Sequence, residues 1–273
     1  MIAFDFSYHQ PTSVKEAIDL YKDLQANGKS IHYISGGTEF ISRARRNEIQ
    51  CDAVIDLKNI PETNQMEWVD DTFIIGACCS LSSLVNDGTF PLLSDVARKI
   101  ATQTERNKIT IGGNVTSHLP YKEAMMPFLL ADSDIVIASE EGMVKQPLSD
   151  LYQKGHLLKD EAFIVQFITN RQWIKCPFTH FRETKQSQIN YPVISLATLE
   201  DGKDIRMAIS GLIDYPFRSQ NLKFGNENIN HMMDNILDQV PETPVSDLQA
   251  ADDYRLFVLK RMIHNILTTK GAS

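Results

Sequence analysis

Two double-glycine segments, far apart in the sequence, carry the residue types best suited to bind a ligand. The first is Ser35-Gly36-Gly37-Thr38-Glu39, and the second is Thr110-Ile111-Gly112-Gly113-Asn114. Glycine lets the backbone turn sharply and approach a ligand closely, and successive exposed N–H groups in such turns form an anion-binding concavity. If the two turns converge within one domain, they could hold a diphosphate from both sides.

The residues around the first segment predict a β-α-β unit. A short strand over residues 31–34 runs into the glycines, a helix begins at Thr38, and a further strand covers residues 53–57. The first glycine pair then lies at a helix N-terminus, where free N–H groups and the helix dipole favour an anion. Upstream, Ser13 and Glu16 have the spacing of a capping box at the start of another helix.

Other signatures of catalysis or cofactor binding are missing from the sequence. It has neither a G-x-G-x-x-G fingerprint after its first strand, nor a P-loop, nor a G-x-S-x-G nucleophile elbow. The seven histidines and four cysteines show no metal-ligand spacing, so we expect no metal site. Only His118, shortly after the second glycine segment, is a candidate neighbour of the site. A diphosphate site without catalytic side chains suggests that a bound cofactor carries the chemistry.

Composition limits the class of protein. The chain has 273 residues, 42% of them hydrophobic, and a formal net charge of −8, which is ordinary for a globular protein and unlike one that grips nucleic acid phosphates. The N-terminus does not resemble a signal peptide, and no apolar stretch approaches the roughly 20 residues of a membrane span. The cysteines are interpreted as buried thiols in a reducing compartment. We therefore expect a cytoplasmic protein that binds neither nucleic acid nor membrane.

The pattern of elements predicts a domain boundary near residue 170. The elements expected before it are strands at 72–76, 134–138 and 163–165 and helices at 81–85 and from 90 towards 101. Those expected after it are strands at 193–196 and 205–209 and helices around 228–237 and 254–267. The last helix carries a stripe at helical spacing that is interpreted as core, namely Tyr254, Phe257, Val258, Arg261, Met262 and Leu267.

Four stretches of the chain resemble the FAD-binding (medium) subunit of the molybdenum hydroxylases, the xanthine dehydrogenase and carbon monoxide dehydrogenase family. The first glycine segment is similar to the family's A-G-G-T-[DE] loop. Arg106-Asn107 followed by the second segment is similar to R-N-x-x-T-I-G-G-N, the most specific of the four. The other two are residues 4–17 and residues 205–211 with 216–218. The resemblance spans nearly the whole chain.

The resemblance implies an α+β fold. A two-lobed FAD-binding domain would occupy residues 1–170, with lobes of about 1–58 and 59–170, before a smaller C-terminal domain of antiparallel strands and helices at 171–273. Both glycine segments would hold the FAD diphosphate, helped by Thr38, Asn114 and Ser117, with Leu57 near the adenosine. Electrons would come from a molybdopterin-binding large subunit through 2Fe–2S clusters on a small subunit, and pass through FAD to NAD or another acceptor. The substrate would be a purine or a related heterocycle.

Two departures from the family's pattern leave other functions open. Where the family has S-P-x-x-D, this chain has Leu119-Pro120-Tyr121-Lys122-Glu123, so Glu123 is the candidate acceptor for a ribose or ring group. Arg182 falls at or near the position of a lysine that lies by the flavin in relatives, and an arginine keeps the charge but not the geometry. The alternatives are an assembly or docking module with weak FAD binding and a stand-alone FAD oxidoreductase.

Overall fold

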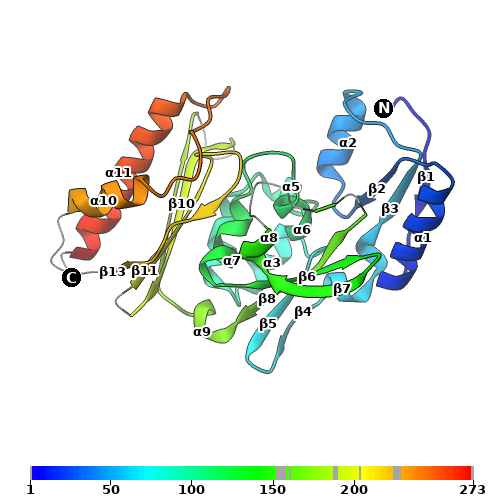
Figure 1. Cartoon of the computed structure of the whole chain (residues 1–273), viewed down its shortest axis with the longest axis horizontal. Helices are drawn as coiled ribbons and strands as arrows, with labels where there is room; N and C mark the ends of the chain where they lie inside the picture. Colours follow the sequence, from blue (N-terminus) through cyan, green and yellow to red (C-terminus); the bar gives the residue numbers. More distant parts are fainter. Residues whose placement is uncertain are drawn as a thin grey trace.

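Three sheets follow one another along the long axis of the molecule, with helices packed between and outside them (Figure 1). The computed structural model describes residues 2–151, 158–159, 161–186, 190–202, 204–223 and 229–271. We call the sheets N-terminal, middle and C-terminal, in chain order. In these ranges no helix is both long and apolar enough to cross a bilayer.

The N-terminal sheet is parallel and has the order β1-β3-β2. Its strands are β1 (Ser7–His9), β2 (Ile31–Ile34) and β3 (Ala53–Asp56), joined through α1 (Val14–Ala26) and α2 (Thr38–Arg45). Ser13 caps α1 as predicted, because its Oγ accepts from the Glu16 N–H. The Glu16 carboxylate reaches back to the N–H and hydroxyl of Thr12 instead of Ser13. The predicted β-α-β unit is therefore present, as β2-α2-β3.

The middle sheet is antiparallel and has the order β4-β5-β8-β6-β7. Its strands are β4 (Met66–Val69), β5 (Thr72–Gly76), β6 (Asp134–Ser139), β7 (Gly142–Pro147) and β8 (Phe163–Asn170). The short helices of this region are η1 (Leu57–Asn59), η2 (Pro61–Asn64), α3 (Leu81–Asp87), α4 (Pro91–Lys99), α5 (Gln103–Arg106), α6 (Ile111–Val115), η3 (Glu123–Met125), α7 (Met126–Leu130) and α8 (Leu148–Leu151). Phe128 of α7 stacks on Phe167 of β8 with ring centroids 4.6 Å apart, which joins helices and sheet in one core.

The C-terminal sheet is antiparallel, with the order β12-β11-β10-β9 and β13 beside β11. Its strands are β9 (Phe178–Thr184), β10 (Pro192–Asp201), β11 (Asp204–Ser210), β12 (Phe217–Arg218) and β13 (Leu222–Lys223). The helices of this part are α9 (Arg171–Ile174), α10 (Ile229–Leu237) and α11 (Asp252–Gly271). Helices α10 and α11 lie on the outer face of the sheet, and α7 lies on the inner face (Figure 1).

The core stripe predicted for the last helix is partly wrong. Tyr254 and Phe257 are about half exposed, whereas Arg255 is fully buried. The Arg255 guanidinium donates to the carbonyl oxygens of Val193 and Gly211, at 2.5 and 2.6 Å, and pairs with Asp247. Because its guanidinium donates to buried carbonyl oxygens, an arginine can face the core, although its charge alone would place that helix face in solvent.

One face of the C-terminal sheet packs into the hydrophobic core of the middle sheet, and its other face forms a separate core with α10 and α11. The last strand of the middle sheet ends at Asn170, and the first of the C-terminal sheet begins at Phe178. Ala197 and Leu199 of β10 nevertheless belong to the same cluster of buried side chains as Phe167. The division into domains at residue 170 stays a prediction, and the region beyond it is packed tightly onto the region before it.

Candidate cofactor site

The two glycine segments meet, although 75 residues separate their closest side chains. Ser35 Oγ lies 2.5 Å from Thr110 Oγ1. Gly36 touches the backbone before the second segment so closely that an added Cβ would lie 2.0 Å from the Lys108 carbonyl oxygen. Such an approach requires glycine, because Cβ atoms never come that near to backbone oxygen. The two segments therefore converge, as a shared ligand site requires.

The segments have different local structures. Gly37 precedes α2 in the left-handed region, with φ of +69°, as expected for a turn into a helix. The second segment was predicted to be a turn, and this is wrong, because residues 111–115 form the short helix α6. Thr110 makes the helix possible, since its hydroxyl accepts from the Gly113 N–H at 3.2 Å.

The two glycines of α6 have separate roles. A Cβ on Gly112 would lie 2.8 Å from both the Cβ and the carbonyl oxygen of Ala77, so this glycine allows helix and strand end to pack. Gly113 is exposed, and a Cβ there would meet only Thr110 Oγ1 at 3.0 Å and Ser35 Oγ at 3.9 Å. Of these two glycines, Gly113 is the exposed one and leaves room for a ligand above its backbone.

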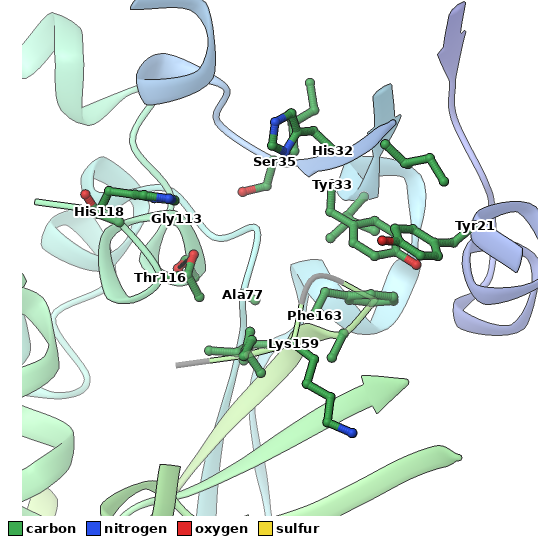
Figure 2. A pocket seen from close by; sticks show the side chains of 18 of the residues that line it. Tyr21, His32, Tyr33, Ser35, Ala77, Gly113, Thr116, His118, Lys159 and Phe163 are labelled. Atoms are coloured by element: carbon green, nitrogen blue, oxygen red, sulfur yellow. Dashed lines mark hydrogen bonds between the residues drawn. The ribbon is translucent and has the colours of Figure 1, made fainter. Parts of the chain in front are cut away.

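A cleft of about 930 Å³ lies where the segments meet, between the N-terminal sheet and the helices of the middle region. Its size is in the range of small-molecule and cofactor sites. Figure 2 shows Ser35 projecting from the loop after β2, opposite Gly113 and Thr116, with Tyr21, Tyr33 and Phe163 at one end. Residues from the N-terminal sheet and from the middle sheet and its helices therefore line one space.

The predicted site residues fall into two groups, those that line the cleft and those that do not. Those that line it are Ser35, Gly112, Gly113 and Ser117, together with the neighbours Leu57 and His118. Those that are not among its lining residues are Gly36, Gly37, Thr38, Glu39, Thr110, Ile111, Asn114, Glu123 and Arg182. Several of the second group shape the walls: Glu39 accepts from the His118 N–H at 3.2 Å, and Asn114 Oδ1 accepts from the Ala124 N–H at 3.2 Å.

The aromatic end of the cleft was missed by the sequence analysis. Tyr21 and Tyr33 stack with centroids 5.1 Å apart, and Phe163 lies 4.9 Å from Tyr33. Burial raises the pKa of Tyr33, so its phenol stays neutral. Tyr21 fits the apolar stripe of α1 and Tyr33 fits a strand, so neither stood out locally. The signal that could have found Tyr33 is its position, because it stands in the strand that runs directly into the first glycine segment.

The opposite end of the cleft is polar. It is lined by Ser117, His118, Pro120, Lys122 and Asp214. Lys122 is only 6% exposed, and burial lowers the pKa of its amine to about 8, against the attraction of Glu39 and Asp214. The sequence analysis did not single out Lys122, although it stands in the stretch that departs from the family's pattern.

Glu123 and Arg182, which were assigned separately to the cofactor, bind each other. Arg182 Nε donates to Glu123 Oε1 at 2.8 Å, and the guanidinium also donates to the Asn190 carbonyl at 2.7 Å. Their side chains are 3% and 6% exposed, for Glu123 and Arg182 respectively. The pair fastens η3, which follows the second glycine segment, to β9 of the C-terminal sheet.

Comparison with known proteins relates this sequence to the medium chains of dehydrogenases. The carbon monoxide dehydrogenase medium chain of Hydrogenophaga pseudoflava is 28% identical over 172 residues, 61% of this chain and 59% of that one. The glyceraldehyde dehydrogenase medium chain of Sulfolobus acidocaldarius is 23% identical over 98% of this chain and 97% of its own.

Solved structures share the fold. Carbon monoxide dehydrogenase from Hydrogenophaga pseudoflava, in a form lacking the Mo-pyranopterin moiety, matches with a TM-score of 0.86 and 22% identity, over 97% of this chain and 96% of that chain. Quinoline 2-oxidoreductase from Pseudomonas putida matches with a TM-score of 0.83 and 20% identity, over 100% and 99% of the two chains. The predicted α+β fold class is confirmed.

The family itself is identified by the N-terminal and middle regions. Residues 4–169 match the FAD-binding domain found in molybdopterin dehydrogenases. This match covers more than half of the chain and both glycine segments, and it confirms FAD as the cofactor expected from the resemblance. The chain belongs to the family of FAD-binding domains of the molybdopterin dehydrogenases.

Proposed function

We propose that this chain is the electron-transfer subunit of a molybdenum hydroxylase and that it holds FAD in the cleft where the two glycine segments meet. The contact between Ser35 and Thr110 carries the proposal, because it joins the two glycine segments, from distant parts of the chain, beside one cleft. Bound FAD would accept and release electrons there. The chain's own residues would bind and orient it.

The residues in the cleft fit the parts of FAD. Gly113 leaves the space that a Cβ would fill, and with the Ser35 and Ser117 hydroxyls it suits a diphosphate in the centre. The rings of Tyr21, Tyr33 and Phe163 suit the flat adenine at one end. The remaining polar end would then take the isoalloxazine.

We further propose that the electrons come from a small 2Fe–2S subunit, beside a large molybdopterin subunit, and leave to NAD or another acceptor. Relatives named medium chains or FAD subunits support a multi-subunit complex. All four cysteines are free thiols, which fits a cytoplasmic location. The names of relatives include carbon monoxide, nicotinate, nicotine and caffeine. A purine or related heterocycle remains our proposed substrate class, to be tested by turnover of the reconstituted complex.

The first test is the visible spectrum of the purified chain, before and after incubation with FAD and desalting. We expect flavin bands that are retained on the protein and released as FAD by denaturation. Loss of flavin both alone and in the co-expressed complex would favour an assembly module with weak FAD binding. Turnover of a small substrate by the chain alone would favour a stand-alone oxidoreductase.

A threonine substitution tests the cradle itself. Thr110→Val removes the hydroxyl that caps α6 and contacts Ser35, so we expect a stability loss of about 1 kcal/mol together with weaker FAD binding. Thr102→Val is the matched control, because the Thr102 hydroxyl likewise caps a short helix, α5, by accepting from the Glu105 N–H, and Thr102 lies outside both glycine segments. We expect a similar loss of stability and unchanged FAD affinity for the control. Equal FAD affinities in the two variants would place the diphosphate elsewhere.

A further inference from the structure

The aromatic side chains of α11 that were predicted to lie in the core are instead on its outer face. Tyr254 and Phe257 are 49% and 53% exposed, and their rings stack with centroids 6.3 Å apart. The Arg261 guanidinium lies over the Phe257 ring, 5.8 Å from its centroid. The inner face of the helix packs through other side chains, such as Val258 and Leu259. Because aromatic residues and arginine are the side chains enriched at protein interfaces, the outer face has the composition of a docking surface.

Charged and aromatic side chains are placed symmetrically about Phe257 along this helix. Asp253 and Arg261 stand four residues before and after it, and Tyr254 and Lys260 stand three residues before and after it. These flanking side chains are all exposed. With about 3.6 residues per turn, Asp253 and Lys260 fall on one side of Phe257, and Tyr254 and Arg261 fall on the other. Each side therefore has an acidic or aromatic group towards the start of the helix and a cation towards its end.

This order is complementary to itself when it is reversed. If a second copy packs its α11 antiparallel to the first, about a two-fold axis beside Phe257, the same side of each helix meets in opposite directions. Asp253 of each copy then lies level with Lys260 of the other, to within about 1.5 Å along the helix axis. Tyr254 of each copy lies equally near the level of Arg261 of the other, which suits a cation–π contact. A parallel arrangement would bring like charges together, so the charges favour the antiparallel one.

We propose that the exposed face of α11 docks onto the same face of a second copy of this chain, with the two helices antiparallel. The two Phe257 rings would meet at the centre, flanked by two ion pairs between Asp253 and Lys260 and two contacts between Tyr254 and Arg261. Helix α11 lies outside the C-terminal sheet, at the opposite end of the molecule from the N-terminal sheet (Figure 1). Docking there leaves the N-terminal sheet free, and it goes beyond the proposed function because it does not require FAD.

The first test is the association state of the full chain, measured by sedimentation velocity over a range of concentrations. Wild type is expected to form a reversible dimer. Phe257→Glu is expected to raise the dissociation constant of this dimer about tenfold or more, because two carboxylates would meet at the two-fold axis. Met143→Glu is the matched control, because Met143 is a 60% exposed side chain on β7 of the middle sheet. The control is expected to dimerise as wild type does, and thermal melting checks that both variants are folded.

A charge exchange tests both the identity of the partner and the orientation of the helices. Asp253→Lys and Lys260→Glu each place like charges together, so each variant alone is expected to dimerise about fivefold more weakly. A mixture of the two variants is expected to form a mixed dimer about as tight as the wild-type dimer, because opposite charges then face each other at both positions. A mere loss of helix stability would not be rescued by mixing.

Three results would overturn this proposal. They are a wild-type chain that stays monomeric, a dimer that Phe257→Glu leaves intact, and a mixture that associates no more tightly than its components. If wild type alone is monomeric and Phe257→Glu releases a different subunit from the co-expressed complex, the face belongs to that subunit and not to a second copy.

Discussion

Gly113→Leu is expected to abolish FAD binding and to leave the fold intact. Gly113 has helical backbone geometry and an open surface, so a side chain there brings no left-handed strain and meets only the hydroxyls of Thr110 and Ser35. The rest of a leucine side chain would continue into the cleft, where we place the diphosphate. We expect FAD affinity to fall about 100-fold or more, a loss of roughly 3 kcal/mol. Flavin fluorescence titration measures this, and thermal melting checks the fold.

Gly113→Ala and Gly112→Ala are the controls for this prediction. The alanine at 113 is expected to keep most of the affinity, because its Cβ requires only a small shift of the Thr110 hydroxyl. The alanine at 112 is expected to lower the melting temperature instead, because its Cβ would lie 2.8 Å from Ala77. If Gly113→Leu bound FAD as wild type does, the diphosphate would not lie against α6.

The glycine segments could be predicted from sequence because their signal is local. Ser35-Gly36-Gly37 stands between a strand and a helix, and both elements form where the hydrophobic pattern places them. The conformation of the second segment was mispredicted, because the capping bond from Gly113 to Thr110 outweighs the low helix propensity of two glycines. The contact between the segments depends on tertiary packing, so no local pattern contains it.

Side chains whose roles depend on packing were harder to predict. Two inner faces compete on α11, namely the predicted one with Tyr254, Phe257 and Val258, and the observed one, which keeps Val258 and adds Leu259. Arg255 decides between them by reaching the carbonyls of Val193 and Gly211, which lie on other elements. In the same way, Tyr21 becomes part of the cleft only because β2 brings Tyr33 beside it. These orientations depend on contacts with residues distant in the sequence, so they do not show in the hydrophobic periodicity of the segment.

From the resemblance to the family, Glu123 and Arg182 were predicted as two separate contacts to the cofactor. The structure shows that the two departures from the family's pattern belong together, because an arginine at 182 meets a carboxylate at 123 across 59 residues of sequence. Buried ion pairs add little stability as a whole, yet removal of one partner leaves an uncompensated charge. The pair therefore has a large predicted effect on stability that is separate from its effect on FAD.

Arg182→Met is expected to destabilise the chain by about 3–5 kcal/mol, because the Glu123 carboxylate, 3% exposed, loses its counter-charge and the Asn190 carbonyl loses a donor. Denaturant unfolding measures the loss. Glu123→Gln combined with Arg182→Met removes the stranded charge, so we expect the double variant to recover a substantial part of the stability. A double variant no more stable than Arg182→Met would mean that the arginine acts through shape and not charge.

FAD affinity separates the two possible roles of the pair. If the pair only fastens η3 to β9, the double variant is expected to bind FAD nearly as wild type does. If either side chain contacts the cofactor directly, FAD affinity is expected to stay low even after the stability has returned.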